Sequence, residues 1–183
     1  ALQIFLTNGK LSLEEANTLN VINNETDNTI EKKKPFWDQD FTNTFKHTYA
    51  FDPIPQVREC YVKNITNTNY TLYPYALGRE ESKKMFLYSP SETGNTHASD
   101  RGNLEVTIKT LDSFALEDID YIKIDAEGYE IEALIGAKKL IEKCKPFIHV
   151  EAKKKVMVKQ NITMNDIKDF FESLLIFFAN FII

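Results

Sequence analysis

Residues 119–151, IDYIKIDAEGYEIEALIGAKKLIEKCKPFIHVE, decide the fold class of this chain. An apolar run ends in the acid Asp125, a turn with Gly128 follows, and an amphipathic helix leads into a second apolar run that ends in Glu151. Two short buried strands joined by a helix are the unit from which parallel sheets are built. Ligands bind at the carboxyl ends of such strands, so acids placed there predict a functional site and favour an enzyme.

The alternation of strand and helix continues on both sides of this stretch. Apolar runs predict strands at residues 2–7, 48–51, 70–77, 84–88, 104–108, 121–124 and 147–150. Apolar residues at helical spacing predict helices at residues 12–21, from Pro53 and Pro55 onward, at 130–143 and at 165–173. The strands at 84–88 and 104–108 are expected to pair antiparallel around the polar loop 89–102. The whole pattern predicts a Rossmann-like α/β fold, with a mostly parallel sheet and helices on both faces.

Length and composition indicate one soluble globular domain. The chain has 183 residues, 43% of them hydrophobic and 27% charged, which allows a sizeable core. The formal net charge of -5 gives no reason to expect a nucleic-acid partner. The apolar residues 174–183 are too few to cross a bilayer, which takes about 20 residues. We therefore expect a final buried strand there and no membrane span, with a truncated membrane segment as the alternative.

The two cysteines, Cys60 and Cys144, each fall on the apolar face of a predicted helix. Because they are far apart in the sequence, buried free thiols are favoured over a disulfide or a metal site. No signal-peptide pattern is present. We therefore expect a cytoplasmic protein.

Five motifs occur in one order: YAFDP at 49–53, YALG at 75–78, TLD at 110–112, YIKIDAEGYE at 121–130 and PFIHVE at 146–151. Together they resemble the FkbM-type S-adenosylmethionine-dependent methyltransferases over roughly residues 49–151. The resemblance implies the class I methyltransferase fold, a seven-stranded, mostly parallel sheet with one reversed strand. It also implies methyl transfer from S-adenosylmethionine to a small-molecule or glycan acceptor, most often at a hydroxyl oxygen of a sugar, lipid-linked glycan or secondary metabolite.

The resemblance also assigns roles to individual residues. Asp52 matches the acid at the end of the second strand that accepts hydrogen bonds from the ribose hydroxyls of the cofactor. Ala76 and Leu77 match the residues beside the adenine. Asp125 and Glu127 match the acids where the methyl donor and acceptor meet, and Asp125 is the better candidate for a general base because it ends the strand.

One part of the family pattern is missing. Its first strand runs into a glycine-rich turn, yet no glycine occurs between Gly9 and Gly78. The first strand is then either the run at 2–7 or a stub at 36–38, with residues 39–44 in place of the turn; we favour the stub. The expected domains are an N-terminal segment, 1–47, that matches the family poorly, and a methyltransferase-like domain, 48–183. The fold is expected to be incomplete at both ends.

Simpler or different roles compete with these assignments. Asp52, Asp125 and Glu127 each precede a predicted helix, where an acid caps the free N–H groups and favours the helix dipole. The missing turn favours a catalytically degenerate or truncated domain that acts as a binding module. A third alternative is a metal-dependent hydrolase or lyase whose ligands include His149 and Glu151. We favour a histidine packed inside the sheet for His149 and expect no metal.

Overall fold

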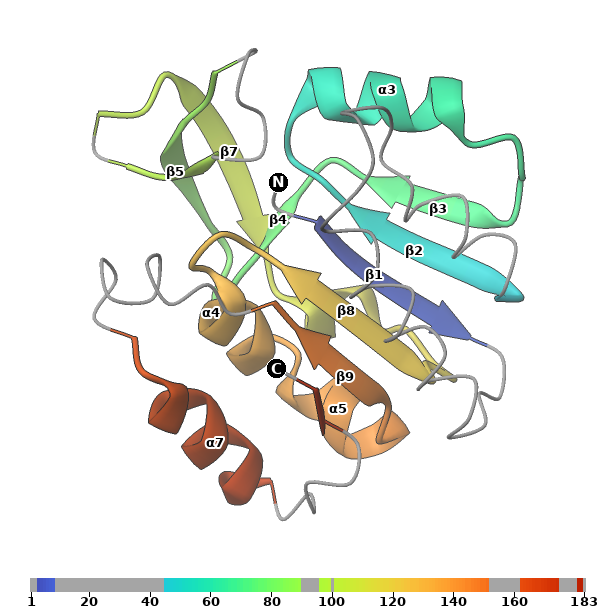
Figure 1. Cartoon of the computed structure of the whole chain (residues 1–183), viewed down its shortest axis with the longest axis vertical. Coiled ribbons are helices and arrows are strands. Elements are labelled where there is room, and N and C mark those ends of the chain that lie inside the picture. The colour runs from blue at the N-terminus through green and yellow to red at the C-terminus, as the bar shows by residue number, and fades with distance from the viewer. Residues whose placement is uncertain are drawn as a thin grey trace, which may run out of the picture.

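The computed structural model describes residues 3–8, 45–89, 96–99, 101–151, 162–174 and 181–182. Within these ranges a six-stranded sheet crosses the molecule in the order β10-β9-β8-β1-β2-β3 (Figure 1). Its strands are β1 (Gln3–Asn8), β2 (His47–Phe51), β3 (Tyr70–Tyr73), β8 (Tyr121–Asp125), β9 (Phe147–Val150) and β10 (Phe181–Ile182). The strand expected in residues 174–183 is therefore present, and it pairs in parallel with β9.

The central strand, β1, is the reversed strand of this sheet. It pairs antiparallel with β2 on one side and with β8 on the other, whereas β2–β3, β8–β9 and β9–β10 are parallel pairs. In the strand order of doubly wound sheets, the place between the second and fourth strands belongs to the first. In this structure β1 occupies that place, and residues 36–38, the favoured position of the first strand, lie outside the described residues. The observed sheet is mixed rather than uniformly parallel.

A second, smaller sheet of four strands has the order β4-β7-β5-β6. Its strands are β4 (Ala76–Leu77), β5 (Ser82–Leu87), β6 (His97–Ala98) and β7 (Leu104–Lys109). The antiparallel pairing of β5 with β7 was predicted. The single strand expected at 70–77 was not observed, because the chain breaks around Pro74 into β3 and β4, which belong to different sheets. Proline has no N–H to donate to a sheet ladder, which accounts for a break there.

Helices cover both faces of the larger sheet, as expected (Figure 1). On one face α3 (Pro55–Asn64) and the residue after it bring Tyr61 and Ile65 against Ala50 and Tyr121. On the other face lie α4 (Glu130–Ile135), α5 (Lys138–Cys144) and α7 (Met164–Ser173). That face carries the larger apolar core, which includes Phe51, Ile122, Ile124, Leu134, Ile141, Ile167 and Phe171. No helix in the described ranges is long and apolar enough to cross a membrane.

The helix predicted at 130–143 is two helices, broken at Gly136 and Ala137. A Cβ on Gly136 would lie 2.0 Å from the carbonyl oxygen of Gly78, so only glycine permits this approach of two backbones. The Gly136 carbonyl also accepts the N–H of Asp112. Helix α4 therefore ends where the segments that contain Gly78, Asp112 and Gly136 meet, and α5 begins just after this point.

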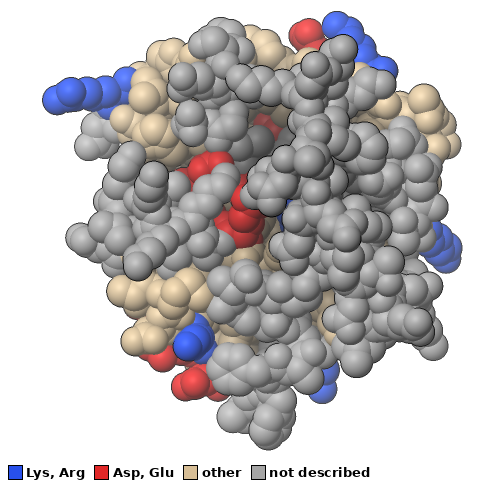
Figure 2. Space-filling model, viewed as in Figure 1, with Lys and Arg blue, Asp and Glu red and all other residues tan. Residues whose placement is uncertain are grey.

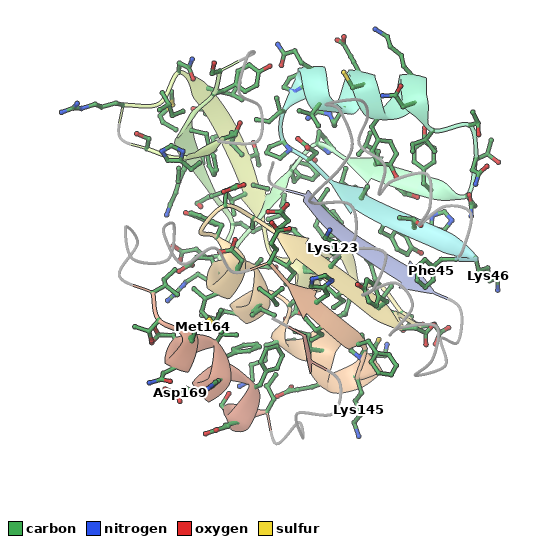
Figure 3. The ribbon with its side chains drawn as sticks, in the orientation of Figure 1. Phe45, Lys46, Lys123, Lys145, Met164 and Asp169 are labelled. Atoms are coloured by element: carbon green, nitrogen blue, oxygen red, sulfur yellow. The ribbon has the colours of Figure 1, made fainter. Side chains whose placement is uncertain are left out.

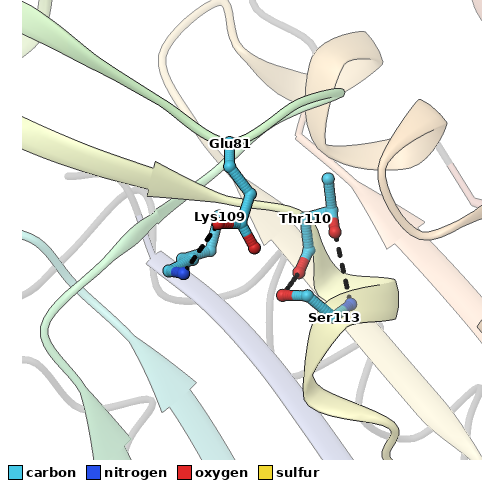
Figure 4. A network of polar contacts seen from close by, with 4 residues as sticks. All are labelled: Glu81, Lys109, Thr110 and Ser113. Carbon is cyan, nitrogen blue, oxygen red and sulfur yellow. Dashed lines mark hydrogen bonds and ion pairs between the residues drawn. The ribbon is translucent and has the colours of Figure 1, made fainter.

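The TLD motif has a structural role at this junction. Thr110 caps a short 3-10 helix, η2 (Leu111–Phe114), by accepting the N–H of Ser113 at 3.2 Å, and the Ser113 hydroxyl donates to the Thr110 carbonyl at 2.7 Å. Figure 4 shows this cap beside the ion pair of Lys109 with Glu81. The two carboxylate oxygens of Asp112 accept the N–H groups of Lys139 and Leu140, which begins α5.

The cysteine prediction was right in one respect and wrong in another. Both cysteines are free thiols. Cys60 is exposed and Cys144 is half-buried, so neither is in the fully buried core. In α3 it is Tyr61, the next residue, that faces the sheet.

Candidate functional site

The structure brings the two predicted strand-end acids to one edge of the larger sheet. Ile4 of β1 pairs with both Phe51 and Ile124, so the residues after them, Asp52 and Asp125, lie level with Gln3 on either side of β1. Neighbouring strands are about 4.8 Å apart, which separates the two Cα atoms by roughly 10 Å. Figure 2 shows acidic side chains gathered near the centre of the face over these strand ends.

Asp52 is 3% exposed and lies two residues before Ile54, the N-cap of α3. Its Oδ1 accepts the Ile54 N–H at 2.8 Å, and its carbonyl oxygen accepts a hydrogen bond from Arg58 Nη1 at 2.8 Å. The capping role weighed against ligand binding is therefore not observed: the N-cap is Ile54, no side chain caps the helix, and Asp52 holds the turn before it. A carboxylate offers about four lone-pair sites, and the bond from the Ile54 N–H uses one of them and orients the group.

The turn after β8 is held by an acid that sequence reasoning did not single out. Glu130 is 4% exposed, and its Oε1 accepts the N–H groups of Ala126 at 3.3 Å and Gly128 at 3.0 Å. Burial raises the pKa of Glu130, the backbone hydrogen bonds oppose that shift, and the nearby Glu127 adds to it. The sequence did carry a signal for this role, because Glu130 is an acid that follows Gly128 at the start of the predicted helix.

Glu127 is buried in this turn in an unusual backbone conformation. Its φ is 46° and that of Gly128 is 99°, so two consecutive residues have positive φ. A non-glycine residue in this region is strained, and such strain clusters at functional sites. The turn fixes Glu127 beside Asp125 and keeps its side chain only 8% exposed.

A buried lysine that the sequence analysis also did not single out lies on β8, two residues before Asp125. The carboxyl edge of the larger sheet is called the rim below, and Asp52, Asp125, Glu127 and Glu151 are its rim acids. Lys123, which is labelled in Figure 3, is 5% exposed and pairs across the strands with His149. The Tyr121 hydroxyl lies 3.2 Å from His149 Nδ1. The pKa of His149 is lowered to about 4, first by burial and then by the charge of Lys123, against an opposing effect of Glu151. His149 is thus packed within the sheet, as we favoured, and is neutral at pH 7.

Ala76 and Leu77 lie in the core rather than on an open surface. Each is 1% exposed, and β4, which they form, pairs with Ile108 and Lys109 of β7. The next residue, Gly78, lines a hollow of about 720 Å³. That volume suits a small-molecule ligand. None of Asp52, Ala76, Leu77, Asp125 and Glu127 lines this hollow, so it is separate from the strand-end acids.

The walls of this hollow combine aromatic, apolar and charged side chains. Arg79 makes a two-pronged ion pair with Glu132, at 2.6 and 2.7 Å, and Lys84 Nζ lies 5.4 Å from the centre of the Tyr129 ring. From α7 come Asp166, Asp169, Phe170 and, just before the helix, Ile162. Tyr129 belongs both to this wall and to the turn that carries Glu127, so it joins the hollow to the rim.

The alternative of a metal-dependent enzyme finds no support in the described part of the chain. There, no three His, Cys, Asp or Glu side chains are grouped so that they could hold a metal ion. The rim acids and His149 are included in that statement.

Comparisons with known proteins agree on one family. The family model described as "Methyltransferase FkbM domain" matches residues 22–177, a wider span than the motifs at 49–151. No curated protein matches. A crystal structure of methyltransferase FkbM from Methylobacillus flagellatus KT is similar, with 18% identity and a TM-score of 0.45; the match covers 72% of this chain and 30% of that one. This chain therefore spans less than a third of that protein's length. Because the family model covers most of its residues, the chain belongs to the FkbM methyltransferase domain family.

Proposed function

We propose that this chain binds S-adenosylmethionine at the carboxyl edge of the larger sheet and transfers its methyl group to a hydroxyl oxygen of a sugar, glycan or secondary metabolite. The observation that supports this most is the common edge of Asp52 and Asp125, each level with Gln3, in a chain of a methyltransferase family. Ligands of doubly wound sheets bind at that edge.

In this proposal Asp52 holds the ribose. Its carboxylate is buried and oriented by the Ile54 N–H, so it is preorganised to accept hydrogen bonds from a vicinal diol. Ala76 and Leu77 are proposed as apolar support near the adenine, acting through the packing of β4 rather than through an open surface.

Asp125 and Glu127 are proposed to act on the acceptor. The bound cofactor supplies the activated methyl group, so the protein's task is to position a hydroxyl and take its proton at a carboxylate oxygen. Asp125 ends β8 at the rim, and Glu127 is fixed in the turn beside it. The hollow beside Tyr129 is not assigned to the acceptor, because neither Asp125 nor Glu127 lines it.

The methionine end of the cofactor fits less well. Because β1 is reversed, it ends at Asn8, level with the start of β2 and on the edge opposite Asp52. Among the described residues before Gly78 there is no glycine that could form the family's turn at the rim. We assign no residue to that end. This observation favours a second candidate, a domain that binds a nucleoside or an acceptor without transferring a methyl group.

Calorimetric titration separates these functions. The 183-residue chain is titrated with S-adenosylmethionine and with S-adenosylhomocysteine, and Asp52→Asn and Glu142→Gln are compared as a buried site variant and an exposed control. We expect binding in the wild type and in Glu142→Gln, and at least about tenfold weaker binding in Asp52→Asn. Folded wild-type protein that gives no heat with either compound contradicts the proposal.

A turnover assay decides between the enzyme and the binding module. Release of S-adenosylhomocysteine in the presence of a panel of glycosides and hydroxylated aromatics supports transfer, with Asp125→Asn as the inactive comparison. Tight binding of the cofactor without release in any member of the panel supports the module.

Two further properties are proposed with this function. Free thiols are typical of a reducing compartment, so we propose the cytoplasm. The formal net charge of -5 is the basis for proposing a small-molecule rather than a nucleic-acid acceptor.

A further inference from the structure

We propose that Lys123 is a positioning residue of the candidate site: its buried ammonium group holds the carboxylates of Asp125 and Glu151 in place at the carboxyl edge. The inference rests on the proposed function and deepens it, because Asp125 is the proposed base. Neither the family match nor the solved structure assigns a role to this lysine.

The strand register places these groups together. Lys123 and Asp125 are two residues apart on β8 and so point to the same face of the sheet. Lys123 pairs with His149, and the Glu151 N–H donates to the Ile124 carbonyl, which continues the ladder and brings Glu151 level with Asp125. The four residues form two adjacent rows, with Lys123 and His149 below and Asp125 and Glu151 at the rim. Rows are about 7 Å apart and strands about 5 Å apart, within reach of a lysine side chain.

The same face continues across β1 to Asp52. Ala50 and Lys123 both pair with Phe5, so they lie on one side of the sheet, and Asp52 is two residues beyond Ala50. Three acids, Asp52, Asp125 and Glu151, therefore share this side of the edge. Like charges gathered in this way repel one another, and a cation beneath them offsets that repulsion.

The burial of Lys123 argues against a purely structural role, because burying an ammonium group costs stability. An ammonium group that is taken from water loses its hydration, and an apolar side chain of similar volume at the same position is usually as stable or more so. A charge retained there needs anionic partners. The acids nearest to it in the register are the two at the rim, one of which is the proposed base.

The charge of Lys123 also acts on His149, its partner across the strands. Lys123 lowers the pKa of His149 and Glu151 raises it, while Tyr121 contacts the ring at Nδ1. His149 is therefore neutral near pH 7, and of these rim-face residues only Lys123 carries a positive charge.

The first test compares stability with ligand binding. Lys123→Met removes the charge at nearly constant volume, Lys123→Arg keeps it, and Lys145→Met is the exposed control (labelled in Figure 3). We expect Lys123→Met to melt at the same or a higher temperature than the wild type. We also expect its affinity for S-adenosylmethionine to fall off at a higher pH on the acid side, because Asp125, which is proposed to lie where the methyl donor meets the acceptor, gains a proton more readily. Lys123→Arg should restore the wild-type pH profile in part. Identical pH profiles for the wild type and Lys123→Met overturn the inference.

A double-mutant cycle then asks whether Lys123 acts through Asp125. If it does, Asp125→Asn should change the affinity for S-adenosylmethionine at least about fivefold less in the Lys123→Met background than in the wild type. Additive effects of the two substitutions contradict the inference. If Lys123→Met does not fold, Lys123→Gln gives the same uncharged comparison in the cycle.

A third measurement does not depend on cofactor binding. Carbon-detected NMR follows the Asp125 carboxyl group and the His149 ring during a pH titration of the ligand-free chain. Lys123→Met should move the midpoints of both groups to higher pH, and an unmoved Asp125 midpoint overturns the inference. If the wild type fails to bind S-adenosylmethionine while these midpoints move, the proposed function fails and the positioning role stands.

Discussion

The turn after β8 gives the sharpest prediction of stability, through replacement of Glu130 by alanine and by glutamine. In the wild type one buried carboxylate oxygen accepts the N–H groups of Ala126 and Gly128. Alanine leaves both without that acceptor, and a buried N–H that loses its partner costs about 1–3 kcal/mol. The bond from Ala126 is the longer, at 3.3 Å, and removing a buried charge returns part of the loss. We expect Glu130→Ala to lower the free energy of unfolding by about 2–3 kcal/mol.

Glutamine keeps an oxygen at the same place, so Glu130→Gln should stay within about 1 kcal/mol of the wild type at pH 7. The two variants also differ in their response to acid. Burial raises the pKa of Glu130 above its usual value of 4.5, so the folded state binds the proton more tightly than the unfolded chain. This contribution stabilises the wild type as the pH falls through the interval from the folded pKa to 4.5, and it is absent in Glu130→Gln.

Urea unfolding followed by circular dichroism at several pH values measures both effects, with exposed Glu142→Ala as the control. Equal losses for the alanine and glutamine variants at pH 7 refute the hydrogen-bond argument. A pH dependence that is the same in the wild type and in Glu130→Gln refutes the argument from burial of the charge.

Three other predictions concern the fold around the site. Gly136→Ala places a Cβ 2.0 Å from the Gly78 oxygen and should lower the free energy of unfolding by about 3 kcal/mol or more; a thermal melt close to that of the wild type contradicts this packing. His149 should titrate in NMR spectra with a midpoint near 4 instead of 6.5; because its pKa is depressed in the folded state, its contribution to stability is lost as the pH falls from 6.5 towards 4, and a midpoint near 6.5 is the opposing result. Asp112→Ala removes the acceptor for the Lys139 and Leu140 N–H groups and should cost about 1–2 kcal/mol, whereas Asp112→Asn should cost less; equal melting temperatures for all three proteins exclude the capping role.

The strand ends were predictable because local pattern determines them. An apolar run that stops at an acid marks both the end of a strand and the side chain that follows it, so Asp52 and Asp125 could be named from the sequence. The helix caps at Thr110 and Asp112 lie in a motif that the sequence also offered, although its role became clear only from their partners.

The direction of β1 and the break at Gly136 could not be read in the same way. The helix breaks at Gly136 because the carbonyl oxygen of Gly78, far away in the sequence, approaches it closely. The direction of β1 depends on its two partner strands, β2 and β8, which local periodicity does not reveal. Lys123 was overlooked for a related reason: within IKID it interrupts an apolar run, and its meaning comes from His149 and Glu151 on the neighbouring strand. Local pattern in a single sequence does not show which distant segments pair with each other.

The place of β1 also has a consequence for how this chain comes together during synthesis. Thr7 pairs with Thr48 on one side and with Tyr121 on the other, so the middle of the sheet leaves the ribosome first and meets its second neighbour 114 positions later. Until then one edge of β1 is open to any other extended segment, including one from another nascent chain. Such distant pairings form slowly, so this domain should depend on assistance against aggregation during synthesis.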